Sequence, residues 1–341
     1  MPRTPVLSAL VISLTVALIG RPDAALAATW YWDTNGTTAG AGSTPSGIWG
    51  GNNYWNSDAT GGAGGTFATS ISSTDTAVFV AGPGATSGTG AYEITLAGPQ
   101  QVSGITFQSS GDATIAPSNP LDTNTAVSIG CGGLTMPVYA YGSVPQGNLT
   151  ITSVATPTAS GTWQVGNGDS WLNLAGKFYT TQSNTVALTG AGMTYITSTN
   201  NASAFGGNGN NLGLVVKNAA VSFANDGYYS PGVGTLAIPG GSYTLLPNMT
   251  LDGGRLSYVY AGQTLAQNSM SLSIGASGGV LDFTQAVEWL CASGVNLKLN
   301  GGAVGAPVSL TKAGAGDLTW GAAINGSLYA NVKAYGGSIA L

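Results

Sequence analysis

Ionisable side chains are scarce in this chain. Histidine is absent from its 341 residues, and lysine, arginine, aspartate and glutamate together make up 6% of them, against about 25% in an ordinary globular protein. Catalytic centres, metal sites and nucleic-acid interfaces are built mainly from these side chains. The composition therefore argues against an enzyme, and we expect no catalytic residue, no metal site and no cofactor.

Long apolar runs are also missing, except at the N-terminus. Residues 9–20 form an apolar stretch that follows Arg3 and precedes the small residues Ala25 and Ala27. This order is typical of a secretory signal peptide cleaved after Ala27, and the stretch is shorter than the roughly 20 residues of a membrane-spanning helix. We expect residues 1–27 to be removed. The mature chain is then predicted to have no membrane span and to be secreted, either into the extracellular space or onto the outer surface of a bacterium.

The mature chain carries few charges of either sign. Without residues 1–27 it has six basic and twelve acidic residues, a net charge of −6. Six scattered cations cannot neutralise a phosphate backbone or an anionic bilayer, so neither nucleic acid nor lipid headgroups are expected partners. A weakly charged surface repels its own copies weakly. The expected partners are therefore the protein itself, associating end to end or laterally, or extracellular glycans.

Cysteine occurs only twice, at Cys131 and Cys291. A secreted protein can form disulfides, but in a stack of coils these two positions would lie several coils apart. A bridge requires Cα atoms within about 7 Å. We expect two buried, unpaired thiols, with a disulfide as the alternative.

Glycine is abundant, at 54 positions, and short runs of alternating apolar and polar residues recur between glycine-rich turns. Such period-2 alternation is typical of half-buried strands, whereas helical periodicity is absent beyond the signal peptide. The chain is therefore predicted to be all-β. Examples of these runs are DTAVFVAG (75–82), NLTITSV (148–154), NTVALTG (184–190) and VSLTKAG (308–314).

A turn of the form Gly-x-Leu or Gly-Gly-x-Leu recurs every 20 to 40 residues, roughly the length of one or two coils of a solenoid. It occurs in GGRLSY (253–258), GGVLDF (278–283), GAGDLTW (314–320) and, with isoleucine, GGSIAL (336–341). We therefore predict a β-solenoid, with a glycine-rich β-sandwich or barrel as the alternative. The last of these segments leaves an open strand edge, which favours end-to-end assembly or a further downstream segment.

Tryptophan is concentrated near the start of the mature chain. Half of the eight tryptophans lie within 26 residues, in segments too rich in glycine for regular strands: Trp30, Trp32, Trp49 and Trp55. The first coil of a solenoid exposes a strand edge that must be covered. We predict a tryptophan-rich capping β region over residues 28–120 and the β-solenoid over 121–341, with the boundary near APSNPLD (116–122).

Several motifs resemble a known family. LTKAGAGDLTW (310–320) is similar to the autotransporter-associated β-strand repeat, Leu-x-Lys-x-Gly-x-Gly-Thr-Leu-x-Leu, with Asp317 in place of the threonine. The residues that match are Leu310, Lys312, Gly314, Gly316 and Leu318. The following segment lacks the Asn-Thr-Tyr stretch usual in the family.

The N-terminal part resembles the leader region of the same secreted proteins. NNYWNSD (52–58), DTAVF (75–79) and SGITFQSSG (103–111) occur in the order typical of that region. The resemblance covers roughly residues 30–110 and 250–341. It implies a right-handed parallel β-helix in a bacterial surface or secreted protein, with no enzymatic activity common to the family.

Two functional alternatives follow from this fold. Right-handed β-helices include polysaccharide-active enzymes, but Glu93 and Glu288 are the only glutamates, Arg255 is the only arginine of the mature chain, and the aspartates stand singly beside turn-forming residues. Neutral-glycan binding is the other alternative. Trp163 and Trp171 would form a sugar-stacking platform with the nearby Asn167 and Asn173 if the rings pointed outward, and would fill the core if they pointed inward. The leading hypothesis is a non-catalytic structural or adhesive solenoid.

Overall fold

The computed structural model is all-β over the residues that it describes, and it contains no helix there. These are residues 27–340 without 84–86, 121, 123, 139–146, 179, 181, 198–211, 223–247, 259–262, 268–270, 284–286, 292–296, 316, 321–323 and 326–327. Within this part of the chain the strands form three sheets, of 14, 11 and 4 strands. No helix long and apolar enough to span a membrane is found among the same residues.

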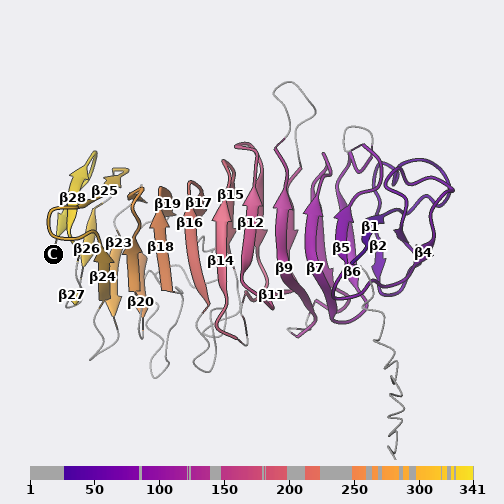
Figure 1. Ribbon diagram of the computed structural model, residues 1–341, viewed down its shortest axis with the longest axis horizontal. Helices are drawn as coiled ribbons and strands as arrows, with labels where there is room; N and C mark the ends of the chain where they lie inside the picture. Colours follow the sequence, from indigo (N-terminus) through magenta and orange to yellow (C-terminus); the bar gives the residue numbers. More distant parts are fainter. Residues whose placement is uncertain are drawn as a thin grey trace, which may run out of the picture.

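Sheet A is the largest sheet and runs along the whole elongated molecule (Figure 1). All its pairs are parallel except β1 with β3 and β3 with β4. In spatial order its strands are β27 (Ile324–Asn325), β24 (Leu297–Gly301), β21 (Ser271–Ile274), β18 (Asn248–Asp252), β16 (Gly213–Lys217), β14 (Thr185–Thr189), β12 (Gly161–Val165), β9 (Ala126–Met136), β7 (Gln100–Phe107), β5 (Thr76–Phe79), β1 (Thr29–Trp32), β3 (Trp55–Asn56) and β4 (Phe67–Ala68), with β11 (Val154–Pro157) paired to β9.

Sheets B and C contain only parallel pairs among the described strands. Sheet B consists of β2 (Gly47–Trp49), β6 (Tyr92–Leu96), β8 (Ala113–Pro117), β10 (Leu149–Ile151), β13 (Trp171–Leu174), β15 (Met193–Ile196), β17 (Ala220–Ser222), β19 (Gly254–Tyr258), β22 (Gly279–Phe283), β25 (Val308–Ala313) and β28 (Ala330–Ala334). Sheet C consists of β20 (Gln263–Gln267), β23 (Val287–Cys291), β26 (Leu318–Trp320) and β29 (Ile339–Ala340).

The chain visits these sheets in rotation. From β12 onward it alternates between sheets A and B, and from β18 it passes through A, B and C in turn. Each return pairs with the strand one coil earlier; Leu188 lies opposite Trp163 and Val216 lies opposite Leu188. The prediction of an all-β, solenoid-like chain is confirmed, because the described strands form long parallel sheets rather than the antiparallel sheets of a sandwich.

Inward-facing side chains of successive coils, nearly all of them apolar, stack in continuous ladders. Alternation along each strand turns every second residue inward, and the parallel register places the inward residues of neighbouring coils opposite one another. Each ladder residue is at most 4% exposed, and burial of one Leu or Val contributes roughly 1.5–3 kcal/mol. One ladder of sheet A comprises Ile105, Leu134, Trp163, Leu188, Val216, Leu251 and Ile274. One ladder of sheet B comprises Ala113, Leu149, Leu172, Thr194, Val221, Leu256, Leu281 and Lys312.

The tryptophan-rich segment lies at the N-terminal end of sheet A. Trp32, Trp49 and Trp55 are fully buried, with ring centroids 5.1 Å apart for Trp32–Trp55 and 5.0 Å for Trp49–Trp55. Phe79 of β5 packs against this cluster, and its ring centroid lies 5.4 Å from that of Trp55. The antiparallel strands β3 and β4 lie beyond β1, so that β1 is not the open edge of the sheet.

The predicted domain boundary near residue 120 falls between β8 and β9. Sheet A continues from β7 to β9 and sheet B from β8 to β10 across this position. The division into residues 28–120 and 121–341 remains a prediction.

One prediction about cysteine is wrong. Cys131 is a free thiol, as expected, but it is exposed rather than buried. It lies at a corner of β9, where the ladder register shifts opposite Val102 and Gly104 of β7, so the alternation that buries Ile129 does not continue through it. Cys291 belongs to β23 of sheet C, and its side chain lies outside the described residues.

Candidate functional site

The side chains of the two tryptophans of the predicted glycan platform point in opposite directions, one toward the outer face of its sheet and the other into the core. In β13, Leu172 and Leu174 are buried whereas Trp171 and Asn173 are half-buried on the outer face. Trp163 of β12 is 1% exposed and packs against Phe178 with ring centroids 5.2 Å apart. The condition that the ring points outward is therefore met by Trp171 and not by Trp163.

Trp171 has an aromatic neighbour on the next coil. Its ring meets that of Tyr195 edge to face, with centroids 6.2 Å apart and an interplanar angle of 84°. Tyr195 lies in β15 directly opposite Asn173, and it too is half-buried on the outer face. The pairing of two coils thus brings together aromatic rings that are 24 residues apart in the sequence.

Amide and hydroxyl groups surround this aromatic pair. The backbone N–H of Trp171 donates to Asn148 Oδ1 at 3.0 Å, and the Thr197 hydroxyl donates to Asn173 Oδ1 at 2.7 Å. We call these residues the sheet B outer patch: Asn148, Trp171, Asn173, Tyr195 and Thr197. Trp171 and Asn173 were identified from the sequence, whereas Asn148, Tyr195 and Thr197 were missed. The only sequence signal for these three residues is that they lie about one coil before or after Trp171 and Asn173. Asn167, the other amide named from the sequence, has its carbonyl in a turn, where it accepts from Ser170 N.

The outer patch itself contains no charged side chain. At one end Asp112 Oδ1 accepts hydrogen bonds from the backbone and side-chain nitrogens of Asn148, at 2.9 and 3.0 Å. In the other direction, Arg255 of β19 pairs with Asp282 of β22 at 3.1 Å. The rings, amides and hydroxyls of the patch offer contacts to the apolar ring faces and the hydroxyl groups of neutral sugars, between charged groups at either end.

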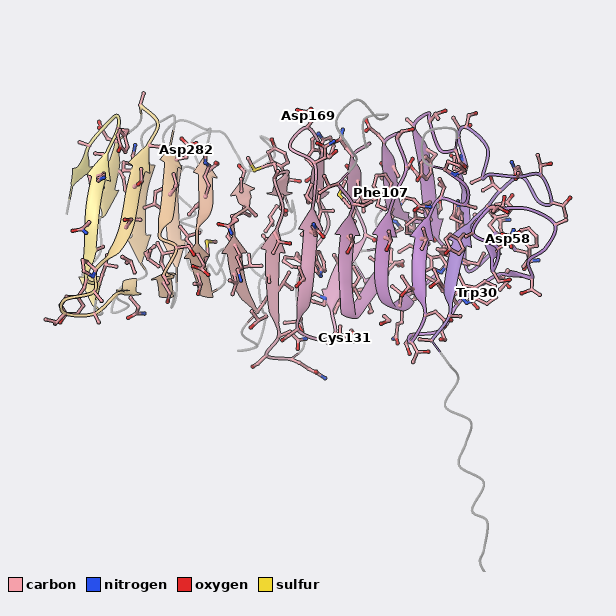
Figure 2. The ribbon with its side chains drawn as sticks, turned by 45° about the horizontal axis from the view of Figure 1, so that its top comes forward. Trp30, Asp58, Phe107, Cys131, Asp169 and Asp282 are labelled. Atoms are coloured by element: carbon pink, nitrogen blue, oxygen red, sulfur yellow. The ribbon has the colours of Figure 1, made fainter. Side chains whose placement is uncertain are left out.

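The described carboxylates are dispersed rather than gathered in one cleft. Asp58, Asp169 and Asp282 lie at widely separated points along the molecule (Figure 2). No group of three or more histidine, cysteine, aspartate or glutamate side chains suited to a metal ion occurs among the described residues.

Two of the described aspartates, Asp58 and Asp122, form turns of the kind that their sequence context predicts. Asp58 Oδ1 accepts from the backbone N–H of Thr60, and Asp122 Oδ1 from that of Asn124, each two residues ahead. These hydrogen bonds, together with those from the Thr60 and Thr125 side chains, hold the pKa of both carboxyls below the ordinary value. A general acid in glycoside hydrolysis needs the opposite shift.

Asp33, which follows Trp32 in the chain, has a raised pKa, but it is fully buried. Burial raises the pKa, and hydrogen bonds from Asn56 Nδ2 (2.9 Å) and from the backbone N–H of Asn35 (3.1 Å) oppose the change. A carboxyl group with no exposed surface cannot reach a polysaccharide. Its partners identify it as part of the packing of the N-terminal end.

A shallow hollow of about 320 Å³ lies among the N-terminal loops. Its walls are small residues without a charged or aromatic side chain, whereas ligand pockets usually combine apolar or aromatic walls with a few directed polar groups. The lining residues are Asn35, Ala39, Gly40, Gly42, Ser43, Thr60 and Pro83. The sheet B outer patch is therefore the better candidate for a binding surface.

Comparison with known proteins assigns neither a family nor a function to this chain, so the patch, the aspartates and the hollow are interpreted from their geometry and chemistry. No protein-family model matches the chain, and neither a curated protein nor a solved structure matches it.

Proposed function

We propose that the protein is a secreted or cell-surface β-solenoid of bacteria that acts as a structural or adhesive element and not as an enzyme. The observation that carries this proposal is the pair of buried ladders, which extend from coil to coil beneath an outer surface of neutral polar side chains. Such an array provides length and repetition, and repeated weak contacts add up to strong adhesion.

The outer face of sheet A illustrates this repetition. Its central row is polar and carries a single charge, at the last position. The row comprises Thr106, Thr135, Gln164, Thr189 and Lys217, which lie opposite one another on consecutive coils. Hydroxyl and amide rows of this kind suit lateral contact with a second copy or with a glycan, the two partners that the composition favours.

A right-handed winding is part of the proposal. Connections between parallel strands of one sheet are right-handed in about 98% of cases, and the described coils connect parallel strands of the same sheet. This general preference supports a right-handed winding. The resemblance to autotransporter-associated repeats implies the same hand.

The repeat motif supports a structural role for its residues. Leu310 and Leu318 are buried, at 3% and 0% exposure, and Lys312 is also at 0%. Lys312 Nζ donates to the carbonyls of Ala313, Gly314 and Gly336, at 2.7, 2.9 and 3.2 Å. The motif side chains thus hold consecutive coils together instead of facing a ligand.

Fractionation and a turnover assay test this function. The protein is expected in the culture medium or on the outer surface of the host cells, and a strain without it should attach or aggregate less. Incubation with a panel of neutral and acidic polysaccharides should release neither reducing ends nor unsaturated products. Retention of the protein inside the cell, or turnover that a single aspartate-to-asparagine exchange abolishes, would contradict the proposal.

Neutral-glycan binding through the sheet B outer patch is a second candidate, favoured by the outward ring pair of Trp171 and Tyr195. Neighbouring coils lie about 4.8 Å apart, so a linear glycan along the solenoid axis would meet one coil after another. On an array of neutral oligosaccharides, Trp171→Ala and Tyr195→Ala should each weaken binding at least tenfold. Tyr335→Ala, which removes a 72% exposed ring on another coil, is the matched control. Equal binding by all three variants would exclude this patch.

A further inference from the structure

The first residue after the predicted cleavage site is held by a buried carboxylate. The backbone N–H of Ala28 donates to Asp75 Oδ1 at 2.8 Å, and the carbonyl of Ala28 accepts from Thr76 N at 2.8 Å. Ala28 directly follows the small-x-small sequence that ends at Ala27. Both alanines are exposed, whereas Asp75 is only 7% exposed.

Asp75 is fixed from several sides. Its Oδ2 accepts from the backbone N–H of Ser72 at 2.8 Å, and its carbonyl accepts from Ser103 N at 2.7 Å at the start of the β7 pairing. Burial by itself would raise the pKa of Asp75, but the hydrogen bonds from Ala28 and Ser72 hold it below the ordinary value. The carboxylate is therefore ionised at neutral pH and positioned where the chain enters β1.

Among the described residues, the segments that surround this carboxylate provide no cation. The turn at 69–75 and the strands β1, β3, β5 and β7 contain only two ionisable side chains, Asp75 and Tyr31. In the uncleaved chain the partner at Oδ1 is a neutral amide. The ionised carboxylate already makes this hydrogen bond charge-assisted, and an ammonium donor would add the attraction between two opposite unit charges.

We propose that Asp75 is the receptor for the α-ammonium group that is created at Ala28 when the leader is removed. An endopeptidase hydrolyses the Ala27–Ala28 peptide bond with one water molecule; Ala27 leaves as a carboxylate, and the Ala28 amine takes up a proton. The new cation remains at the position of the former amide and forms an ion pair with Asp75. Processing thereby fastens β1 to β5 at the N-terminal end of sheet A.

The cleavage step rests on the proposed secretion, whereas the docking step can be tested on its own. The full chain is treated in vitro with a bacterial leader peptidase, and the product is sequenced from its N-terminus. The expected sequence is Ala-Thr-Trp-Tyr-Trp. Cleavage at any other bond would overturn the assigned site.

The docking step is tested by the reactivity of the new amine. An α-amine ordinarily has a pKa of about 7.7–8.0, and a neighbouring buried carboxylate raises it. At pH 7 an amine-reactive reagent should modify Ala28 about tenfold more slowly in the processed wild type than in processed Asp75→Asn, which corresponds to about one pKa unit. Asp169→Asn, at an exposed carboxylate elsewhere, should react like the wild type.

A second comparison covers the case in which Asp75→Asn does not fold. A processed chain with one glycine added before Ala28 keeps Asp75 but displaces the amine from it, and it should react about as fast as a free α-amine. Slow reaction of the wild type alone supports the receptor. Equal rates in the wild type, the extended chain and Asp75→Asn would overturn it, even if the cleavage site is correct. If the protein proves not to be exported but the cleaved chain shows the slow reaction, the proposed location fails and the receptor stands.

Discussion

Leu281 of β22 lies directly opposite Lys312 of β25, so a lysine occupies the ladder position that Val221, Leu256 and Leu281 fill on the preceding coils. Lys312 is fully buried. Its amino group reaches past the core to the carbonyls of Ala313 and Gly314 in its own coil and Gly336 in the next. The side chain therefore combines an apolar stem in the ladder with a cation that satisfies carbonyl groups at a coil junction.

Removal of this cation should loosen the last coils. Lys312→Met keeps the apolar stem but leaves the three carbonyls without their donor, and we expect a loss of about 1–3 kcal/mol in the free energy of unfolding. Urea denaturation followed by circular dichroism measures the change. Lys333→Met, at an exposed lysine in β28, should change stability by less than about 0.5 kcal/mol. Equal stability of the two variants would show that the buried amino group stabilises nothing.

Much of the strand pattern was predictable because each strand obeys a two-residue period. In VSLTKA the residues Val308, Leu310 and Lys312 share one face, and all three are buried. The same period also predicts which way the two candidate tryptophans point. Trp163 lies on the same strand face as buried Val165, whereas Trp171 lies on the face opposite to that of buried Leu172.

Contacts between coils could not be predicted in the same way. The pairing of Trp171 with Tyr195 depends on the number of residues in the intervening turns, which differs from coil to coil. Cys131 was misjudged for a related reason, because the corner at Gly130–Gly133 interrupts the alternation on which burial was inferred. Strand faces therefore follow from local sequence, while the composition of a surface patch follows from loop length.

The buried carboxyl of Asp33 should make the N-terminal end less stable as pH rises. Since its folded-state pKa is raised above the ordinary value of 3.8, the folded state binds the proton more tightly than the unfolded state does. Its contribution is fully present below pH 3.8 and is lost as pH rises through the folded-state pKa. Urea unfolding followed by tryptophan fluorescence between pH 3 and 7 tests this: the stability of the wild type relative to Asp33→Asn should fall with increasing pH.

The contribution of Asp58 to stability should depend on pH in the opposite direction. Its pKa is lowered by hydrogen bonds from Thr60, so its contribution is present above pH 3.8 and is lost as pH falls through the lower folded-state value. Relative to Asp58→Asn, the wild type should therefore gain stability as pH rises. The same trend for both variants would contradict the opposite directions of the two pKa shifts. Asp58 itself helps to raise the pKa of Asp33 by like-charge repulsion, although burial is the larger cause.

The different orientations of Trp163 and Trp171 predict different costs of truncation. Trp163→Ala removes a ring that is 1% exposed and packed on Phe178, and we expect a loss of about 3–5 kcal/mol. Trp171→Ala removes a half-buried ring on the outer face and should cost about 1 kcal/mol, from its edge-to-face contact with Tyr195. Guanidinium denaturation of the two variants measures this difference, and similar costs would contradict the inward orientation of Trp163.

The spacing between coils should be sensitive to a single methyl group at Gly133. This residue has a φ of +65° at the corner of β9, and a Cβ there would lie 2.0 Å from the Thr162 carbonyl oxygen of the next coil. Gly36 has a similar φ of +72°, but nothing lies within 4 Å of its Cβ position. Gly36→Ala therefore reports the cost of the left-handed backbone alone, about 1–2 kcal/mol. Gly133→Ala adds steric overlap with backbone that cannot move without separating β9 from β12, so it should cost a further 1–3 kcal/mol or so. Thermal unfolding of both variants measures the difference, and equal midpoints would mean that the coils can separate at this corner without loss of stability.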